Sequence, residues 1–262
     1  MLTFTHKVSL GDKVALIRVS GVILDSTEIV DELKEYSKDN SIKAVILRVD
    51  SPGGAVAPSQ EIYEEIVKIK EKKKVVVSMG TVAASGGYYI SAPADRIVAN
   101  AGTLTGSIGV IMEIPNVSGL MKKIGVETQV VKSGAHKDIA SVFKSLTPEE
   151  KQILQTVLDD VHDQFISAVS EGRGKKLEEI RKLADGRIFT GRMAKELGLV
   201  DELGNLQDAI LLAGELTGIK GEPQVVEKKE KFSFVDMLKS ELPQRLIGNV
   251  FQGISLKYLM TP

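Results

Sequence analysis

Residues 44–54, Ala-Val-Ile-Leu-Arg-Val-Asp-Ser-Pro-Gly-Gly, decide the fold class of this chain. The first part, 44–49, is almost continuously apolar, which is typical of a strand buried on both faces of a parallel sheet. The second part, 50–54, contains two glycines, which let the backbone turn sharply at the end of that strand. The stretch therefore predicts a strand followed by a tight turn at the carboxyl edge of a sheet.

The segments around this strand alternate between strand-like and helical patterns. Apolar runs at 13–19 and 75–79 predict two further strands. Apolar residues at helical spacing predict helices over 25–38 and 60–69. This order favours right-handed βαβ crossovers around a parallel sheet, so we expect an α/β fold.

A long helix is predicted to begin at Thr147-Pro148-Glu149-Glu150, which combines an N-cap, a first-turn proline and a capping box. It should end near Glu171, before Gly172 and Gly174. Shorter elements are expected as strands at 96–99, 108–112 and 127–131 and as helices at 175–184, 191–197 and 206–217.

The chain divides at a charged linker, residues 227–231. We expect one domain over 1–226 and an amphipathic C-terminal tail over 227–262, with apolar residues spaced from 232 onward. Two interpretations of the tail stay open. It packs as a helix on the core or on a neighbouring subunit, or it docks on a membrane or occupies a neighbour's substrate groove.

Composition excludes several kinds of chemistry. The chain has 262 residues and no cysteine, so disulfides, thiolate catalysis and cysteine-based zinc sites are ruled out. Its three histidines form no ligand-spaced pair, and we expect no metal. The net charge of −1 gives no global attraction for nucleic acid. No apolar run approaches the ~20 residues of a membrane-spanning helix.

Residues 81–89, Thr-Val-Ala-Ala-Ser-Gly-Gly-Tyr-Tyr, place Ser85 between small residues directly after a predicted strand. A serine at a tight strand-to-helix transition has its hydroxyl in the open beside free backbone N–H groups, as a hydrolytic nucleophile requires. The alternative is that Ser85 only caps a helix. The glycines of 50–54 likewise form either an oxyanion hole or an ordinary turn.

A nucleophilic serine needs a base, and the residues alone leave several candidates. His162 lies in a predicted helix among acidic residues, whereas His136 lies in the segment 132–138, which also contains Lys132 and Lys137. A lysine can act as a base when burial lowers its pKa enough to leave it neutral. Serine–lysine pairs are an established variant of the catalytic triad.

Several motifs together resemble the signal peptide peptidase A family of bacterial and archaeal Ser–Lys proteases. The motif at 185–204, Asp-Gly-Arg-Ile-Phe-Thr-Gly-Arg-Met-Ala-Lys-Glu-Leu-Gly-Leu-Val-Asp-Glu-Leu-Gly, is too long to match by chance. The resemblance covers roughly residues 13–215 and implies a ClpP/crotonase-like fold, a spiral of stacked βαβ units with a helical C-terminal extension. The other matching segments are 50–54, 81–89, 103–110 and 132–138.

The resemblance assigns roles by position. It implies Ser85 as the nucleophile, Lys137 as the general base and Ser107 as the hydroxyl that orients the lysine amine. Lys132 remains a rival base.

The same resemblance implies that the backbone N–H groups of Gly53 and Gly86 form the oxyanion hole, with Gly54 shaping the turn. Asp138 follows Lys137 and would raise the pKa of the lysine if it faced the amine, but in an extended segment the two side chains point to opposite sides.

The implied activity is that of a serine endopeptidase that hydrolyses membrane-derived peptides, such as remnant signal peptides, through an acyl-enzyme, with no cofactor. The family further implies a homo-oligomer, an octameric ring, with membrane contact, an extracytoplasmic location and no nucleic-acid partner. The family usually carries an N-terminal membrane anchor, whereas twelve residues precede the first predicted strand here.

Two other functions are compatible with parts of the sequence. A crotonase-type acyl-CoA enzyme shares the fold but would carry acidic or other catalytic residues in place of Ser85 and Lys137. A non-catalytic oligomeric scaffold for membrane partners is disfavoured because Ser85, Ser107 and Lys137 are all present.

The assignment of the base is directly testable. We expect Lys137→Ala to abolish peptide hydrolysis and Lys132→Ala to leave it intact, because only the general base is needed to deprotonate the serine. Peptide products would be measured by mass spectrometry. The reverse result would make Lys132 the base.

Overall fold

A computed structural model describes residues 12–228 and 257–260, and it contains a mixed sheet in which parallel pairing dominates. The strands β1 (Lys13–Ser20), β2 (Ile42–Ser51) and β4 (Lys74–Ala84) pair in parallel at its centre. The α/β fold expected from the alternation of strands and helices is confirmed. The middle strand is buried on both faces, as its apolar sequence predicts, with Val45, Ile46 and Leu47 each 0% exposed.

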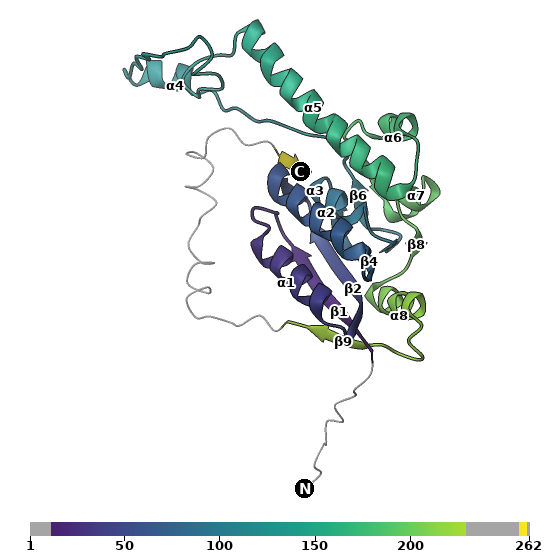
Figure 1. Cartoon of the computed structure of the whole chain (residues 1–262). Helices are drawn as coiled ribbons and strands as arrows, with labels where there is room; N and C mark the ends of the chain where they lie inside the picture. The colour runs from purple at the N-terminus through teal and green to yellow at the C-terminus, as the bar shows by residue number, and fades with distance from the viewer. Residues whose placement is uncertain (1–11, 229–256, 261–262) are drawn as a thin grey trace.

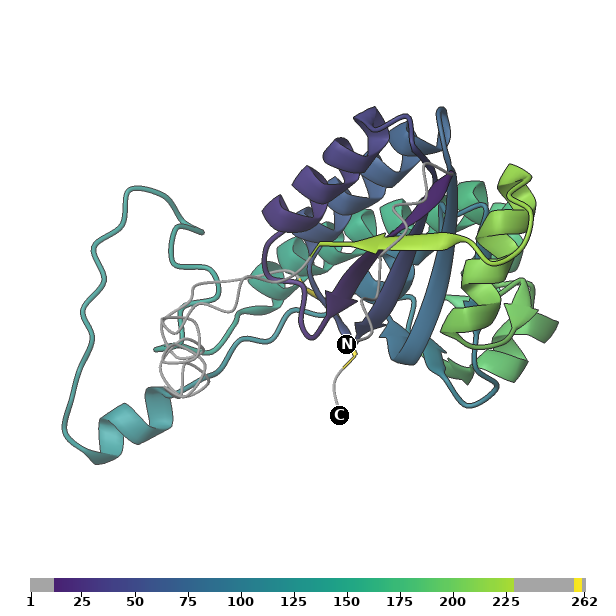
Figure 2. The same ribbon diagram turned by 90° about the horizontal axis from the view of Figure 1, so that it is seen from below.

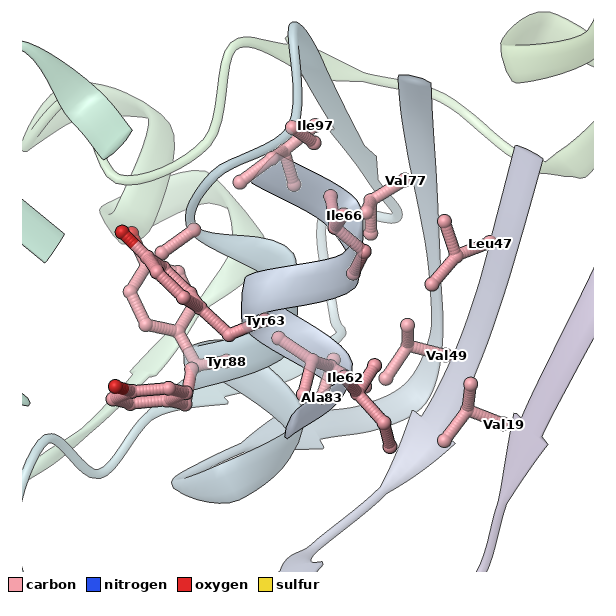
Figure 3. Close-up of a cluster of buried hydrophobic side chains, with 14 of the residues drawn as sticks. Val19, Leu47, Val49, Ile62, Tyr63, Ile66, Val77, Ala83, Tyr88 and Ile97 are labelled. Atoms are coloured by element: carbon pink, nitrogen blue, oxygen red, sulfur yellow. The ribbon is translucent and has the colours of Figure 1, made fainter. Parts of the chain in front are cut away.

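Helices cover both faces of this sheet (Figure 1). On one face, α1 (Thr27–Lys38) and α2 (Val56–Lys70) pack against inward-pointing strand residues. Figure 3 shows this layer, where Ile62 and Ile66 of α2 meet side chains of the sheet. The opposite face packs on α8 (Leu206–Thr217) through a separate cluster. The two clusters use alternate residues of each strand, as the period of two requires.

Shorter elements complete the structure. The sheet runs in the order β7-β6-β4-β2-β1-β9, while β5 pairs with β4 and β8, and β3 and β10 form a separate pair. The remaining strands are β3 (Gly53–Ala55), β5 (Arg96–Ala99), β6 (Leu104–Gly106), β7 (Ile188–Thr190), β8 (Glu202–Leu203), β9 (Gln224–Glu227) and β10 (Lys257–Leu259). The remaining short helices are α3 (Gly86–Ser91), α4 (Ser118–Lys123), α6 (Leu177–Leu183) and α7 (Gly191–Glu196).

The long helix α5 (Pro148–Arg173) begins as predicted, because Thr147 and Glu150 form the full capping box. It ends at Gly174, whose φ of 60° is left-handed, and not before Gly172. Gly172 lies inside the helix, where a Cβ would overlap the carbonyl of Ala92. The glycine there serves close packing against the residue that follows α3.

Two predicted strands are wrong. Residues 127–131 are exposed and pair with no strand, and 108–112 contributes only a single bridge at Ile111. Both belong to or adjoin an arm, residues 112–146, that projects from the body of the protein (Figure 2). The stretch 127–131 in this arm has no neighbouring strand to pair with, so the β-propensity of its valines and threonine does not produce a strand.

The predicted tail is described only at its end. Residues 257–259 form β10, the yellow strand in Figure 1, which pairs antiparallel with β3. The predicted linker 227–231 begins at the last residue of β9, and the apolar stretch before residue 257 lies outside the described residues. In the described part of the chain, no helix has the length and apolar character needed to cross a membrane.

The capping box of α5 gives a stability prediction. Thr147→Ala should lower the free energy of unfolding by about 1 kcal/mol, because the N–H of Glu150 loses its acceptor. Thr156→Ala is the control, since Thr156 lies on the exposed surface of the same helix and caps nothing. Denaturant unfolding would measure both, and equal losses would contradict a specific role for the cap.

Candidate active site

The candidate site lies where β2 and β4 end. The two strands are parallel neighbours, so the turn after β2 and the turn after β4 meet at the same sheet edge. Their backbones touch closely: a Cβ on Gly53 would lie 2.6 Å from the nitrogen of Gly86, and one on Gly86 would lie 3.0 Å from that of Gly54. The structure thus brings the predicted glycines together with Ser85, which precedes Gly86.

Ser85 occupies an unusual backbone conformation, with φ of 53° and ψ of −118°. Its N–H donates to Gly106 and its carbonyl accepts from the N–H of Tyr89, both at 2.8 Å, so this conformation is held from two sides. Only glycine adopts positive φ without strain, which makes the serine costly here.

The Ser85 hydroxyl makes no capping hydrogen bond, although Ser85 stands at the N-cap position of α3. Its Oγ is buried and has no hydrogen-bond partner among the described residues. The interpretation of Ser85 as a simple helix cap therefore finds no support in the geometry, and a buried unpartnered hydroxyl in strained backbone requires another explanation.

The two glycines of the first turn point their N–H groups in different directions. The Gly53 N–H donates to Ser51 Oγ at 3.1 Å, and the Gly53 carbonyl accepts from Ile23 at 2.9 Å. The Ala55 N–H also bonds Ile23, at 2.7 Å. Because successive residues of a strand face opposite sides, the N–H of the intervening Gly54 faces away from Ile23, toward β10. Gly54, beside Gly86, therefore presents the N–H that Gly53 was predicted to supply.

Three polar side chains that the sequence analysis did not single out hold these turns. Asp50 accepts from the Val82 N–H at 3.1 Å, and Ser51 accepts from Gly53. The Ser59 hydroxyl donates to the Ala55 carbonyl at 2.9 Å, close to where a Cβ on Gly86 would lie. Asp50 and Ser51 stand in the quoted turn motif, where their affinity for nearby backbone N–H groups is a usable signal.

Ser107 lies close to Ser85, since it follows Gly106, whose carbonyl accepts from the Ser85 N–H. Its own N–H donates to the Arg187 carbonyl at 2.9 Å, and its φ of 50° is also positive. The side chain lines a cavity of about 460 Å³ that β10 adjoins through Leu259. Ser107 therefore lies near Ser85, and its expected role of orienting a lysine amine stays a prediction.

Lys137 is not brought to this site within the chain. It lies exposed in the projecting arm, and it does not hydrogen-bond Ser85. Figure 2 shows the arm standing away from the sheet.

Lys132 forms hydrogen bonds within the same arm. Its Nζ donates to Asp138 Oδ1 at 2.6 Å and to the Ala135 carbonyl at 2.7 Å. Lys144 also binds Asp138, at 3.1 Å. Hydrogen bonding to Lys132 and then to Lys144 lowers the pKa of Asp138, so this carboxylate is already neutralised by two lysines other than Lys137. Lys132 is thus engaged with Asp138 and Ala135, and the Ser85 hydroxyl is not among its partners.

Within residues 12–228 and 257–260, no group of three or more His, Asp or Glu side chains is placed to hold a metal ion. The chemistry that the described site offers is that of a hydroxyl between backbone N–H donors.

The βαβ units that carry this hydroxyl and these glycine N–H groups form a ClpP-like α/β fold. The Clp protease family model matches residues 14–105. The model of peptidase family S49 matches residues 68–220, more than half of the chain. The chain belongs to peptidase family S49 and is a protease.

Curated relatives agree. The chain is 46% identical over 228 residues to "Putative protease slr0021" of Synechocystis, covering 86% of this chain and 81% of the relative. It is 40% identical to "Putative signal peptide peptidase SppA" of Enterococcus faecium, covering 76% and 62%, and 40% identical to "Protease 4" of Salmonella typhi, covering 80% and 35%. The chain thus spans less than two thirds of the latter two relatives.

The strain at Ser85 yields a prediction that separates stability from activity. Ser85→Gly should be more stable than Ser85→Ala by about 1 kcal/mol, because glycine accepts positive φ. Both variants should lack activity. At Ser91, in the ordinary backbone of α3, the order should reverse, with glycine ~1 kcal/mol less stable than alanine. Thermal unfolding would show this, and a less stable Ser85→Gly would contradict the strain.

Proposed function

We propose that this protease is a serine endopeptidase in which Ser85 attacks the scissile carbonyl and Lys137 is the general base. The observation that carries the proposal is the buried Ser85 Oγ, which has no partner among the described residues and is held in strained backbone beside glycine N–H groups. Such strain persists where the surrounding structure maintains it, and it is typical of catalytic residues.

The oxyanion hole in this proposal uses the N–H groups of Gly54 and Gly86. Gly54 replaces the predicted Gly53, because the N–H of Gly53 already donates to Ser51 Oγ. Fixed N–H donors stabilise the negative charge of the tetrahedral intermediate without reorganising during the reaction.

The base is supplied by a second copy of the chain. Lys137 is exposed on the arm of residues 112–146, while the Ser85 hydroxyl has no partner among the described residues, so each site would combine the serine of one copy with the lysine of another. An arm of one subunit that completes the site of the next is a heterologous contact, which generates a ring when the rotation between subunits closes. This supports the ring-shaped homo-oligomer that the sequence resemblance implies.

In the assembled site, burial of Lys137 would lower its pKa and leave the amine neutral. Ser107, next to Ser85, would accept a hydrogen bond from that amine and aim its lone pair at Ser85 Oγ. The amine takes the serine proton as Oγ attacks, and the protonated lysine returns it to the leaving amine. Water, deprotonated by the same lysine, then releases the acyl group.

The proposed substrates are extended peptides left in or near membranes, including remnant signal peptides. The printed name of the Enterococcus faecium relative points to this class. An extended substrate is supported because the backbone of β3, beside Ser85, can pair with an extended peptide segment, as it does with β10. A protease located at the membrane surface would encounter such peptides directly.

A mixing experiment tests the shared site. Ser85→Ala and Lys137→Ala should each be inactive, yet mixing them after subunit exchange should restore about a quarter of wild-type activity, because a random neighbour pair supplies both residues in one case of four. Digestion of unfolded casein, followed by mass spectrometry, measures this.

The control mixes Ser85→Ala with the double variant Ser85→Ala/Lys137→Ala, which should stay inactive because no subunit carries the serine. If subunit exchange is verified and the mixture of Ser85→Ala and Lys137→Ala stays inactive, the shared site is contradicted. The serine and its base would then come from the same chain, or Lys137 would not be the base.

A further inference from the structure

The turn that carries Lys137 is held by a chain of alternating charges. Asp138, the residue after Lys137, accepts from Lys132 Nζ at 2.6 Å and binds Lys144 Nζ at 3.1 Å. Lys144 in turn donates to the carboxylate of Glu150 in the first turn of α5. This charge chain therefore connects the turn in the arm to a long helix, in the order Lys132, Asp138, Lys144 and Glu150.

The acidic members of the charge chain are shielded from water. The side chain of Asp138 is 14% exposed and that of Glu150 is 4% exposed. Glu150 is fixed further because it closes the capping box with Thr147, and later turns of α5 pack in the hydrophobic core through Phe165 and Val169. Isolated surface ion pairs contribute little, whereas charges that share partners in a network restrain one another. The charge chain can therefore hold the turn in one geometry relative to α5.

The backbone of the turn is compact and includes Asp138 itself. The Lys137 N–H donates to the Gly134 carbonyl at 3.2 Å, and the Ser141 N–H donates to the Asp138 carbonyl at 3.0 Å. Asp138 thus has two roles in the arm, because its backbone belongs to the turn and its carboxylate belongs to the charge chain. Holding the carboxylate therefore also holds the backbone from which the Lys137 side chain extends.

Lys137 itself stands outside the charge chain. Residues 132–144 contain three lysines, and Lys137 is the one that forms no ion pair in the described part of the chain. The residue before it, His136, faces Glu149 of α5 at 3.6 Å. An unbalanced Asp138 carboxylate beside Lys137 would favour the charged amine and raise its pKa. The two lysines bound to Asp138 balance that charge locally.

We propose that Asp138 is a positioning residue for the general base. Its carboxylate anchors the Lys137 turn to α5, and its two lysine partners neutralise the charge that it would otherwise present to Lys137. The inference rests on the proposed function, since it takes Lys137 as the base. It adds the residues that hold this lysine and that set how readily its amine loses a proton.

The pH dependence of kcat/KM tests the electrostatic part, because its ascending limb reports the pKa of the base in the free enzyme. Asp138→Asn leaves two lysine charges unbalanced near Lys137, so the limb should move to lower pH by about half a unit. Lys144→Met removes a charge that balances Asp138, so the limb should move to higher pH by a similar amount. Hydrolysis of labelled, unfolded casein would measure both profiles against wild type.

Hydrogen exchange tests the anchoring without hydrolysis. In the full chain with Ser85→Ala, adding Asp138→Asn should speed amide exchange in residues 137–144 about tenfold, because the turn loses its attachment to α5. Adding Glu127→Gln instead should leave this rate unchanged. Glu127 is an exposed carboxylate of the same arm, and it forms no ion pair with any residue that the structure describes.

Unchanged exchange with Asp138→Asn would overturn the inference, and so would pH limbs that move in the same direction or stay in place. These outcomes are separate from failure of the proposed function. If Lys137→Ala stays active, Lys137 is not the base and the proposed function is rejected. If Lys137→Ala is inactive while Asp138→Asn matches wild type in both measurements, the proposed function stands and the positioning role of Asp138 is rejected.

Discussion

The close contact between the turns after β2 and β4 is the constraint on which the rest of the site depends. Where Gly53, Gly54 and Gly86 meet, side chains would collide with neighbouring backbone: one on Gly54 would overlap the Ile23 carbonyl. Because these residues lack side chains, two N–H groups and the Ser85 hydroxyl can share one small space. The parallel sheet maintains the contact, since it brings both strand ends to the same edge.

This contact has an energetic cost that the core offsets. Ser85 and Ser107 both have positive φ, and neither is a glycine. Central strands buried on both faces supply the stabilisation that lets such strain persist. The helix α5 joins this packing through Phe165, which contacts Tyr258 of β10.

Much of the fold was predictable because its signals are local. The buried strand at 44–49, the capping box at Thr147 and the alternation of strands and helices all follow from patterns within a few residues. The strands predicted at 108–112 and 127–131 were wrong because a strand also needs a partner, and pairing is not a local property. The end of helix α5 shifted past Gly172 for a similar reason: packing against Ala92 required a glycine within the helix.

The sequence by itself determined the α/β class, the family resemblance and the residue types of the candidate site, including Ser85, Ser107 and the glycines. These follow from motif order and hydrophobic periodicity, which are properties of the sequence alone. Only the tertiary structure decided that Gly54, and not Gly53, turns its N–H toward β10, that Lys137 stands apart on an arm, and that Tyr258 of β10 is buried among aromatic side chains. Each of these depends on strand register or on contacts between residues distant in sequence.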